Sequence, residues 1–507
     1  METRDADRSG AQVLYLHPAK QEVDARYDRY IASPTYPLIP VGVLGLANML
    51  IEEGLPLRGV NLPLELVMQP SFSLRQWLVR QGRPGLIMID LHWYEHCFGA
   101  LDVARTCKAV FPETPVVVGG LTASRFARSI LAGFDEVDYV IRGDAERPLK
   151  LLAGLCCSGA ASGASLARIP NLSYRDGGHV RENSQTYVAT TADLDRLDFV
   201  SLRFLQHSES YAAIQYTGAG LVRPEQPQLK GHWLSIGRGC VYNCSFCGGA
   251  RSTQRKLAGR DGIVLRSVER TLDDIARLKA LGVHQVSLSL DPAIIGPHFW
   301  GPLFAGLRDR GLRIGIYNEF FQLPSEEFLS SFAEVSDRSH TEVAISPLSG
   351  NEHVRRRNGK LFSNQELFRT LDWLRARELP LYVYFSLNLP GETPKTFEET
   401  LRVAEQIGRR YPARLLRMIN KCHTLDPGSP MSDTPSRFDV QPQYKTFIDY
   451  YGYCQQTGWQ ARIVTRGTLR GFASARLDPT QIEGLAQLWD AFAQEQEFTC
   501  FPVPRGW

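Results

Sequence analysis

The stretch Gly237-Arg-Gly-Cys-Val-Tyr-Asn-Cys-Ser-Phe-Cys-Gly-Gly249 places three cysteines, Cys240, Cys244 and Cys247, in the spacing C-x3-C-x2-C. It directly follows the apolar run Leu234-Ser-Ile236, which is typical of a short strand. Iron–sulfur clusters are normally held by four cysteine thiolates. Three closely set thiolates are enough to hold three irons of a cubane cluster, and they leave the fourth iron open to another ligand.

Two other interpretations of the cysteines are weaker. Free cysteine is a small and often buried hydrophobe, but buried cysteines do not usually cluster in a glycine-rich loop. Structural zinc sites normally have four protein ligands, which usually occur as two closely spaced pairs in the sequence. The nearest remaining cysteines, Cys157 and Cys422, show no paired spacing, although His232 or His284 could fold in as ligands. The pattern therefore favours an iron–sulfur cluster.

The composition limits the class of protein. The chain has 507 residues, 43% of them hydrophobic and 22% charged, as in a globular protein of about three domains. A net charge of +3 gives no reason to expect nucleic acid or a membrane as a partner. We expect no secretion signal and no membrane span, because no apolar run of that kind is present. Ten cysteines are too few for a disulfide scaffold, which favours a reducing, cytoplasmic location.

Residues 11–155 alternate short apolar runs with amphipathic stretches, the pattern of parallel βαβ units. We predict an α/β domain with a doubly wound, flavodoxin-like or Rossmann-like parallel sheet. The expected strands are Val13–His17, Leu86–Asp90, Pro115–Gly120 and Val137–Gly143. A doubly wound sheet binds its ligands beyond the carboxyl ends of the strands. Those ends carry His17, Asp90, His92, Trp93, Gly119, Gly120, Gly143 and Asp144.

The rest of the chain divides into three regions. Residues 156–230 are small and irregular in composition and are predicted to be a connector. Residues 231–420 resume the βα rhythm and predict a partial (β/α)6 TIM-type barrel, whose chemistry sits at the carboxyl ends of the strands. The cysteine loop lies at such an end, directly after the first strand. Residues 421–507 predict a mixed, partly helical C-terminal region, with Thr480–Glu495 as its clearest helix.

The stretch Arg238-Gly-Cys-Val-Tyr-Asn-Cys-Ser-Phe-Cys247 resembles the signature of the radical S-adenosylmethionine (SAM) superfamily. The resemblance implies a [4Fe–4S] cluster on Cys240, Cys244 and Cys247, with SAM on the fourth iron. It further implies reductive cleavage of SAM to a 5′-deoxyadenosyl radical that abstracts hydrogen from the substrate. An external electron donor such as flavodoxin or ferredoxin is then expected as a partner.

The resemblance extends over residues 230–432. Ser289-Leu-Asp-Pro292 is similar to a family stretch that meets the methionine amino group, with Asp291 in place of the usual glutamate. Ile345–Lys360 resembles the "ESGS…R.NK" region, and Asn388–Thr393 resembles the "PGET" loop. A turn and helix cap would also explain that last loop. The expected cofactor-binding residues in these stretches are Asp291, Ser346, Asn388, Pro390 and Gly391. Phe246, between the second and third cysteines, is either an aromatic shield or adenine neighbour of the cofactor or a residue of simple loop packing.

The N-terminal domain resembles the cobalamin-binding fold of cobalamin-dependent radical SAM enzymes. The similar stretches are Val41–Gly54, Pro115–Ala123 and Asp138–Glu146. Cobalamin is therefore an expected cofactor, but the usual D-x-H-x-x-G lower-ligand motif is absent. Asp90-Leu-His92 has only its first half and lies on a later strand than the motif normally occupies.

Glycines and aromatic residues at the strand ends are the expected cobalamin contacts. Gly119 and Gly120 permit close approach of a corrin, or they simply make a tight turn. Gly143 lies at a further strand end. The rings of His17, His92, Trp93 and His96 line the corrin face in this hypothesis, with packing against the barrel as the alternative.

Tyr317 and Glu319 lie at a barrel strand and are the candidate catalytic acid–base residues. Together the two domains favour a cobalamin-dependent radical SAM methyltransferase that acts on an unactivated carbon of a small-molecule or peptide substrate. The alternative is a radical SAM enzyme of another reaction type, such as epimerisation, rearrangement or transfer of another SAM-derived group. A non-enzymatic cobalamin or iron–sulfur sensor is the least favoured function.

Overall fold

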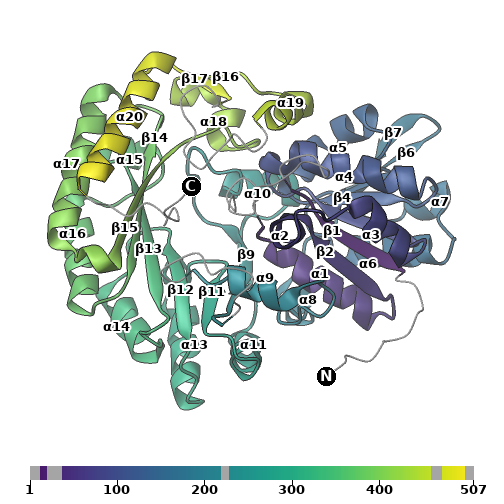
Figure 1. The fold of residues 1–507 in the computed structure, drawn as a ribbon, viewed down its shortest axis with the longest axis horizontal. Coiled ribbons are helices and arrows are strands. Elements are labelled where there is room, and N and C mark those ends of the chain that lie inside the picture. The colour runs from purple at the N-terminus through teal and green to yellow at the C-terminus, as the bar shows by residue number, and fades with distance from the viewer. Residues whose placement is uncertain (1–11, 20–36, 218–227, 458–470, 497–507) are drawn as a thin grey trace.

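The computed structural model describes residues 12–19, 37–217, 228–457 and 471–496. Two α/β units lie side by side, and C-terminal elements run across from one to the other (Figure 1). Within the described ranges no helix is both long and apolar enough to cross a membrane.

The N-terminal sheet has the strand order β2-β1-β3-β4-β5-β6-β7, and its first five strands are parallel. The five-strand order 2-1-3-4-5 is that of the flavodoxin-like doubly wound fold, with its switch point between β1 and β3. The predicted fold class is therefore confirmed. The strands are β1 (Val13–His17), β2 (Leu57–Asn61), β3 (Leu86–Asp90), β4 (Val116–Gly119), β5 (Tyr139–Ile141), β6 (Leu172–Asp176) and β7 (His179–Glu182).

Helices cover both faces of this sheet, which is why β1 and β3 are buried along their whole length. One face packs on α1 (Val41–Glu52) and α6 (Glu146–Cys157), and α2 (Leu62–Met68) contributes side chains to the cores on both faces. The other face packs on α3 (Leu74–Gln81), η1 (Tyr94–His96), α4 (Cys97–Val110) and α5 (Leu121–Gly133).

The segment 156–230, predicted as a connector, instead supplies two strands of the N-terminal sheet. β6 pairs antiparallel with β5 and with β7. Gly177 and Gly178 have φ angles of 56° and 80° between the two strands, so the glycine pair makes a tight hairpin turn. The segment also forms α7 (Gly163–Leu166), α8 (Thr191–Asp195) and α9 (Ser208–Ile214).

The second unit is a six-stranded parallel sheet in the order β15-β14-β13-β12-β11-β8, the predicted partial barrel. Its described edge strands β8 and β15 do not pair with each other, so the barrel is open on one side. The strands are β8 (Gly231–Leu234), β11 (Gln285–Leu288), β12 (Gly315–Phe320), β13 (Glu342–Leu348), β14 (Leu381–Leu387) and β15 (Leu416–Cys422). The outer helices are α11 (Val268–Ala280), α13 (Pro297–Asp309), α14 (Glu326–Val335), α16 (Asn364–Ala376) and α17 (Pro394–Arg410).

Short elements cluster at the carboxyl ends of the barrel strands. An antiparallel pair of strands, β9 and β10, follows β8 directly. These elements are β9 (Gly237–Cys240), α10 (Arg251–Ala258), β10 (Gly262–Leu265), α12 (Pro292–Ile295) and α15 (Glu352–Arg357). A further short helix, η2 (Ala413–Leu415), lies at the amino end of β15.

The C-terminal region contacts both units (Figure 1). α19 packs on the N-terminal domain through Phe447, whose ring centroid lies 5.8 Å from that of Phe126. α20 packs on the barrel, where Trp489 meets Phe385 at 5.8 Å. The elements are α18 (Pro430–Asp433), η3 (Pro435–Phe438), β16 (Val440–Pro442), α19 (Phe447–Thr457), β17 (Phe472–Ser474) and α20 (Pro479–Glu495).

Candidate active site

The cysteine loop leaves the carboxyl end of β8 and is fixed by short backbone contacts. Cys240 ends β9, where it pairs with Gly262 of β10. The backbone N–H of Tyr242 donates to the Cys240 sulfur at 3.4 Å, and that of Gly249 donates to the Cys247 sulfur at 3.3 Å. Amide donors of this kind stabilise a thiolate and tune a bound cluster.

The three sulfurs suit a cluster better than a single ion. Among the described residues, the one group of His, Cys, Asp or Glu side chains close enough to share a single metal ion lies elsewhere. In a cubane each thiolate binds its own iron, so its sulfurs need not converge on one point. The donor chemistry of Cys240, Cys244 and Cys247 therefore fits a [4Fe–4S] cluster, and the zinc alternative loses support.

Burial keeps two of the thiols protonated when no iron is bound. Burial raises the pKa of Cys244, and Lys360 partly opposes this shift. Burial and the neighbouring carboxylate of Asp426 raise the pKa of Cys247 to about 12. Metal binding needs the thiolate form, so assembly of a cluster here must release protons.

The loop is held from the barrel side by the turn after α15. A Cβ on Gly359 would lie 2.8 Å from the Cys244 Cα, and the φ of Gly359 is 96°. Only glycine fits there without strain. Asn358 hydrogen-bonds the Ser245 hydroxyl and donates to the Pro390 carbonyl at 3.0 Å. These contacts tie the cysteine loop to two of the loops that the motifs singled out.

Asp291 caps a helix. Its carboxylate accepts hydrogen bonds from the backbone of Ala293 at 3.0 Å and of Phe321 at 2.8 Å. The Asn318 amide donates to it at 3.2 Å. Burial raises the pKa of Asp291 to about 6, against the pull of these bonds. The geometry gives Asp291 a role as the N-cap of α12, and contact with the methionine amino group stays a prediction.

Asn388, a predicted SAM contact, has an amide group without a described protein partner. It is fully buried at the end of β14 with a φ of 66°, and neither amide atom has a hydrogen-bond partner among the described residues. Such an orphaned amide is costly unless a ligand satisfies it. Gly391, with φ of 89°, lies so close to Arg357 that a Cβ would be 3.0 Å from its Cδ.

Glu392 was not among the predicted site residues, although it lies in the same loop. Its carboxylate accepts from the backbone N–H of Asn388 at 2.7 Å and of Leu389 at 3.3 Å. Burial raises the pKa of Glu392 to about 8. The buried carboxyl therefore holds the loop in the conformation that presents Asn388.

Phe246 stacks on a residue that no motif indicated. Its ring lies 4.2 Å from that of His423, at an interplanar angle of 24°. Burial lowers the pKa of His423 to about 3, so this imidazole is neutral. The Phe246 side chain also packs against Leu348 and Leu389, so it extends from the cysteine loop towards the carboxyl ends of the barrel strands.

Tyr317 and Glu319 face the interior of the barrel. The Tyr317 hydroxyl donates to Glu319 at 2.8 Å, and Ile316 and Phe320, which flank the pair, join the outer core. Glu319 is exposed although it lies on a central strand, so the barrel interior is open to solvent at this level. Burial, and then Glu319, raise the pKa of Tyr317 well above its usual range.

Aromatic rings and a second carboxylate complete the lining. The rings of Trp233 and Tyr382 lie 5.9 and 6.2 Å from that of Tyr317, and Tyr384 stacks beyond Tyr382. Burial raises the pKa of Glu342 to about 7. Ser346, another predicted cofactor contact, is half-buried on β13, two residues beyond the inward Ala344.

Two charged residues beside the cysteines were missed by sequence reasoning. Lys360 is buried and donates to the Phe321 carbonyl at 2.7 Å. Burial lowers its pKa, and the adjacent Cys244 opposes this. Asp426 accepts from the backbone of Gly248 at 3.1 Å. Lys360 closes the "R.NK" stretch, which is a signal for it, whereas Asp426 belongs to no recognisable motif.

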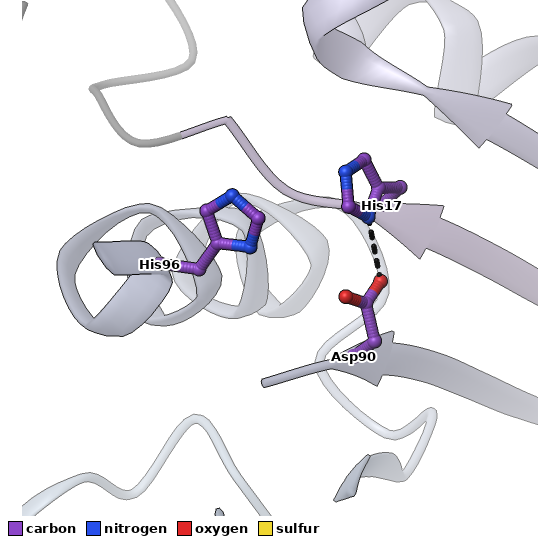
Figure 2. A group of neighbouring side chains, drawn as sticks. All are labelled: His17, Asp90 and His96. Carbon is purple, nitrogen blue, oxygen red and sulfur yellow. Dashed lines mark hydrogen bonds and ion pairs between the residues drawn. The ribbon is translucent and has the colours of Figure 1, made fainter. Parts of the chain in front are cut away.

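The predicted cobalamin contacts gather at the carboxyl edge of the N-terminal sheet. His17 and Asp90 end β1 and β3 and form a hydrogen bond of 2.9 Å (Figure 2). The ring of Trp93 lies 5.0 Å from that of His92. Burial lowers the pKa of His92 and keeps its imidazole neutral.

The three glycines at this edge differ in what surrounds them. A Cβ on Gly120 would lie 2.6 Å from the His92 Cα, and one on Gly143 would lie 3.0 Å from the Ala258 Cα. Protein packing alone therefore requires both glycines. A Cβ on Gly119 would meet nothing closer than 3.8 Å, so its backbone is approachable and fits a large ligand such as a corrin.

Ion pairs join this edge to the cysteine loop. Arg238, two residues before Cys240, pairs with Glu146 at 2.5 Å and with Asp144 at 3.3 Å. Arg260 pairs with the same Asp144. The carboxyl ends of both sheets therefore meet at one interface.

The family model of the radical SAM superfamily matches residues 234–404. Hopanoid C-3 methylase of Methylococcus capsulatus is 25% identical over 284 residues, which is 56% of this chain and 48% of that enzyme. A tRNA-2-methylthio-N(6)-dimethylallyladenosine synthase of Corynebacterium diphtheriae is 21% identical over 77% of this chain and 65% of its own length. The matches thus span less than two thirds of each relative.

Two solved structures share the two-domain fold. The radical SAM methyltransferase TsrM of Kitasatospora setae, with cobalamin and a [4Fe–4S] cluster bound, aligns with a TM-score of 0.63 over 98% of this chain and 90% of TsrM, at 14% identity. The cobalamin-dependent radical SAM enzyme OxsB aligns with a TM-score of 0.53 over 97% of this chain and 62% of OxsB, at 13% identity. Residues 234–404 are thus a radical SAM domain, a family whose cofactors are a [4Fe–4S] cluster and SAM, and the chain also carries an N-terminal domain with a B12-binding-like fold.

Proposed function

We propose that this protein is a cobalamin-dependent radical SAM methyltransferase that acts on an unactivated carbon of a small-molecule or peptide substrate. The observation that carries the proposal is the ion-paired interface, in which Arg238 of the cysteine loop binds Asp144 and Glu146. Both acidic residues directly follow the carboxyl end of β5. A ligand at the switch-point edge of the N-terminal sheet and a cluster on the cysteines would therefore share one cavity.

The bound cofactors would supply a carbon radical from SAM and a methyl group from the corrin. The chain's own residues hold these groups in place. Asn388 is free to hydrogen-bond SAM, and Phe246 with His423 forms a flat apolar wall beside the cysteines. A cavity lined in this way keeps water from a reactive radical.

The barrel interior supports a substrate with a flat or apolar part and a hydrogen-bond donor. Trp233, Tyr382 and Tyr384 offer aromatic faces, which bury large apolar surfaces. Glu319 is exposed to the interior and receives a hydrogen bond from Tyr317. In the proposed function Glu319 binds an N–H or O–H group of the substrate and accepts a proton where product formation releases one.

The first test needs no knowledge of the substrate. Anaerobically reconstituted protein is incubated with SAM, reductant and cobalamin, and two products are measured separately. S-adenosylhomocysteine reports transfer of the methyl group, and 5′-deoxyadenosine reports radical cleavage. We expect both products, with S-adenosylhomocysteine dependent on cobalamin, and we expect Cys240→Ala to abolish 5′-deoxyadenosine. Flavodoxin or ferredoxin is proposed to replace the chemical reductant.

Other outcomes would redirect the proposal. If 5′-deoxyadenosine forms but no S-adenosylhomocysteine appears with or without cobalamin, a radical reaction of another type takes its place. If Cys240→Ala keeps a full cluster, the assignment of the three cysteines fails. With a candidate substrate in hand, a deuterated methyl group on SAM must appear in the product.

A further inference from the structure

Three metal-ligating side chains converge at the carboxyl edge of the N-terminal sheet, away from the cysteines. They are His17 at the end of β1, Asp90 at the end of β3 and His96 at the end of η1 (Figure 2). Their donor atoms all lie within 4.8 Å of one another. Both imidazoles are fully buried, and Asp90 is 6% exposed.

The spacing of these donors suits a single ion. His17 Nδ1 and Asp90 Oδ1 are 2.9 Å apart. Two ligand atoms at about 2.1 Å from one ion, and at right angles to each other, lie about 3 Å apart. The ring of His96 stands 5.2 Å from that of His17, at an angle of 83°, so both rings border the same space.

The carboxylate adds a second observation. Asp90 Oδ2 is buried and has no hydrogen-bond partner in the part of the chain that the structure describes, whereas Oδ1 also accepts from Tyr15 at 2.7 Å. Asp90 therefore places a buried, partly unsatisfied carboxyl beside two imidazoles, and a buried carboxylate is stabilised by pairing with a bound cation.

We infer that His17, Asp90 and His96 form a mononuclear site for a divalent transition-metal ion, distinct from the iron–sulfur cluster. Two imidazoles and one carboxylate suit Zn²⁺, Fe²⁺ or Co²⁺ and leave coordination positions for water or another ligand. The site lies at the β1/β3 switch point, where a doubly wound sheet binds its ligands. An ion bound there would connect the ends of β1 and β3 to η1 at the base of the domain's ligand site.

The geometry favours a free ion over the cobalt of a corrin. A corrin ring fills the equatorial positions of its cobalt, so only one protein donor can bind from below. Here three donors converge, and both imidazoles are covered by protein. The inference is independent of the proposed methyl transfer, since it needs neither corrin nor SAM.

Co²⁺ is the probe for the test. The full-length protein is reconstituted with its cluster, kept oxidised and titrated with Co²⁺, and bound metal is counted after gel filtration. High-spin Co²⁺ gives an electron paramagnetic resonance (EPR) signal, whereas the oxidised [4Fe–4S] cluster gives none. We expect about one bound Co²⁺ per chain, competed by Zn²⁺.

Matched variants decide whether these residues are the ligands. His17→Gln, His96→Gln and Asp90→Asn keep size and hydrogen bonding, and each should lose the bound Co²⁺ and its signal. His92→Gln is the control, because His92 lies on the same loop and outside the group. Unchanged circular dichroism and unchanged cluster iron show that each variant is folded.

Three results would overturn the inference. They are no Co²⁺ bound by the wild type, full binding by His17→Gln and His96→Gln, and equal loss in His92→Gln. A separate arm adds cob(II)alamin alone. If nitrogen splitting from His17 appears in its EPR signal, the residue is instead the axial base of a corrin and the free-ion site is wrong.

Discussion

Replacing Gly359 by alanine tests whether the turn after α15 fixes the cysteine loop. The φ of Gly359 is 96°, and a Cβ there would lie 2.8 Å from the Cα and 2.9 Å from the sulfur of Cys244. The left-handed backbone costs an alanine about 1–2 kcal/mol. Overpacking against Cys244 adds about 1–3 kcal/mol. The expected loss of folding stability is therefore about 2–5 kcal/mol. Displacement of Cys244 would relieve the steric part of it.

Gly282 provides the matched control. It has a φ of 77°, and a Cβ there would meet no atom within 4 Å. Gly282→Ala therefore carries the backbone cost without the steric contact. At about 2–4 °C per kcal/mol, the unfolding midpoint should fall by about 2–8 °C for Gly282→Ala and about 4–20 °C for Gly359→Ala.

The decisive assay is iron content after anaerobic reconstitution, read beside thermal unfolding by circular dichroism. Gly359→Ala should bind far less iron than wild type, because the movement that relieves the steric contact displaces Cys244, a predicted cluster ligand. Gly282→Ala should bind as much iron as wild type. Equal iron content in the two variants would refute the argument that Gly359 positions Cys244.

Three further predictions follow from buried polar groups. Asn388→Ala should weaken SAM binding in equilibrium dialysis, because the buried amide has no described protein partner and is available to the ligand; unchanged SAM affinity contradicts this. Glu392 has its pKa raised to about 8, so wild type should lose thermal stability relative to Glu392→Gln as pH rises from 4.5 to 8, and parallel pH profiles would refute this. Arg238→Gln removes a cation beside Asp144 and Glu146 and should weaken cobalamin binding, measured by absorbance titration, while cluster iron is kept. A cobalamin affinity equal to that of wild type would contradict the predicted effect of Arg238 on the cobalamin site.

The two large sheets could be predicted because their strands are buried on both faces. Val13–His17 and Leu86–Asp90 read as short apolar runs between helices, and they became β1 and β3. β7 gave no such signal, because it is an edge strand whose residues are mostly exposed. Its hairpin glycines, Gly177 and Gly178, lie in the segment 156–230, whose small and irregular composition predicts a connector rather than strands.

The site could be predicted only where its residues share a local motif. The cysteines lie within eight residues, and Asn388 and Gly391 lie within one loop. His423 and Asp426 reach the cysteine loop from about 180 residues away, through pairing of strands that no local pattern records. The same holds for His17 and Asp90, which are 73 residues apart in the chain and share a hydrogen bond only because β1 and β3 are neighbours.

Contacts from beyond the barrel also hold the cysteine loop. Residues just after the barrel contact that loop and the helix that follows it: the Met431 N–H donates to the Ser245 carbonyl at 2.9 Å, and the Thr253 hydroxyl of α10 donates to the Gly428 carbonyl at 2.6 Å. Asp433 then pairs with Lys256 of α10 at 2.9 Å and with Arg125 of the N-terminal domain at 3.2 Å. The segment 424–433 is thus a strap between both domains and the cysteine loop. Truncation of the chain at the end of β15 would remove the contacts that Gly428, Met431 and Asp433 make. Because Asp433 also pairs with Arg125, this segment links the position of the cysteine loop to the N-terminal domain as well as to the barrel.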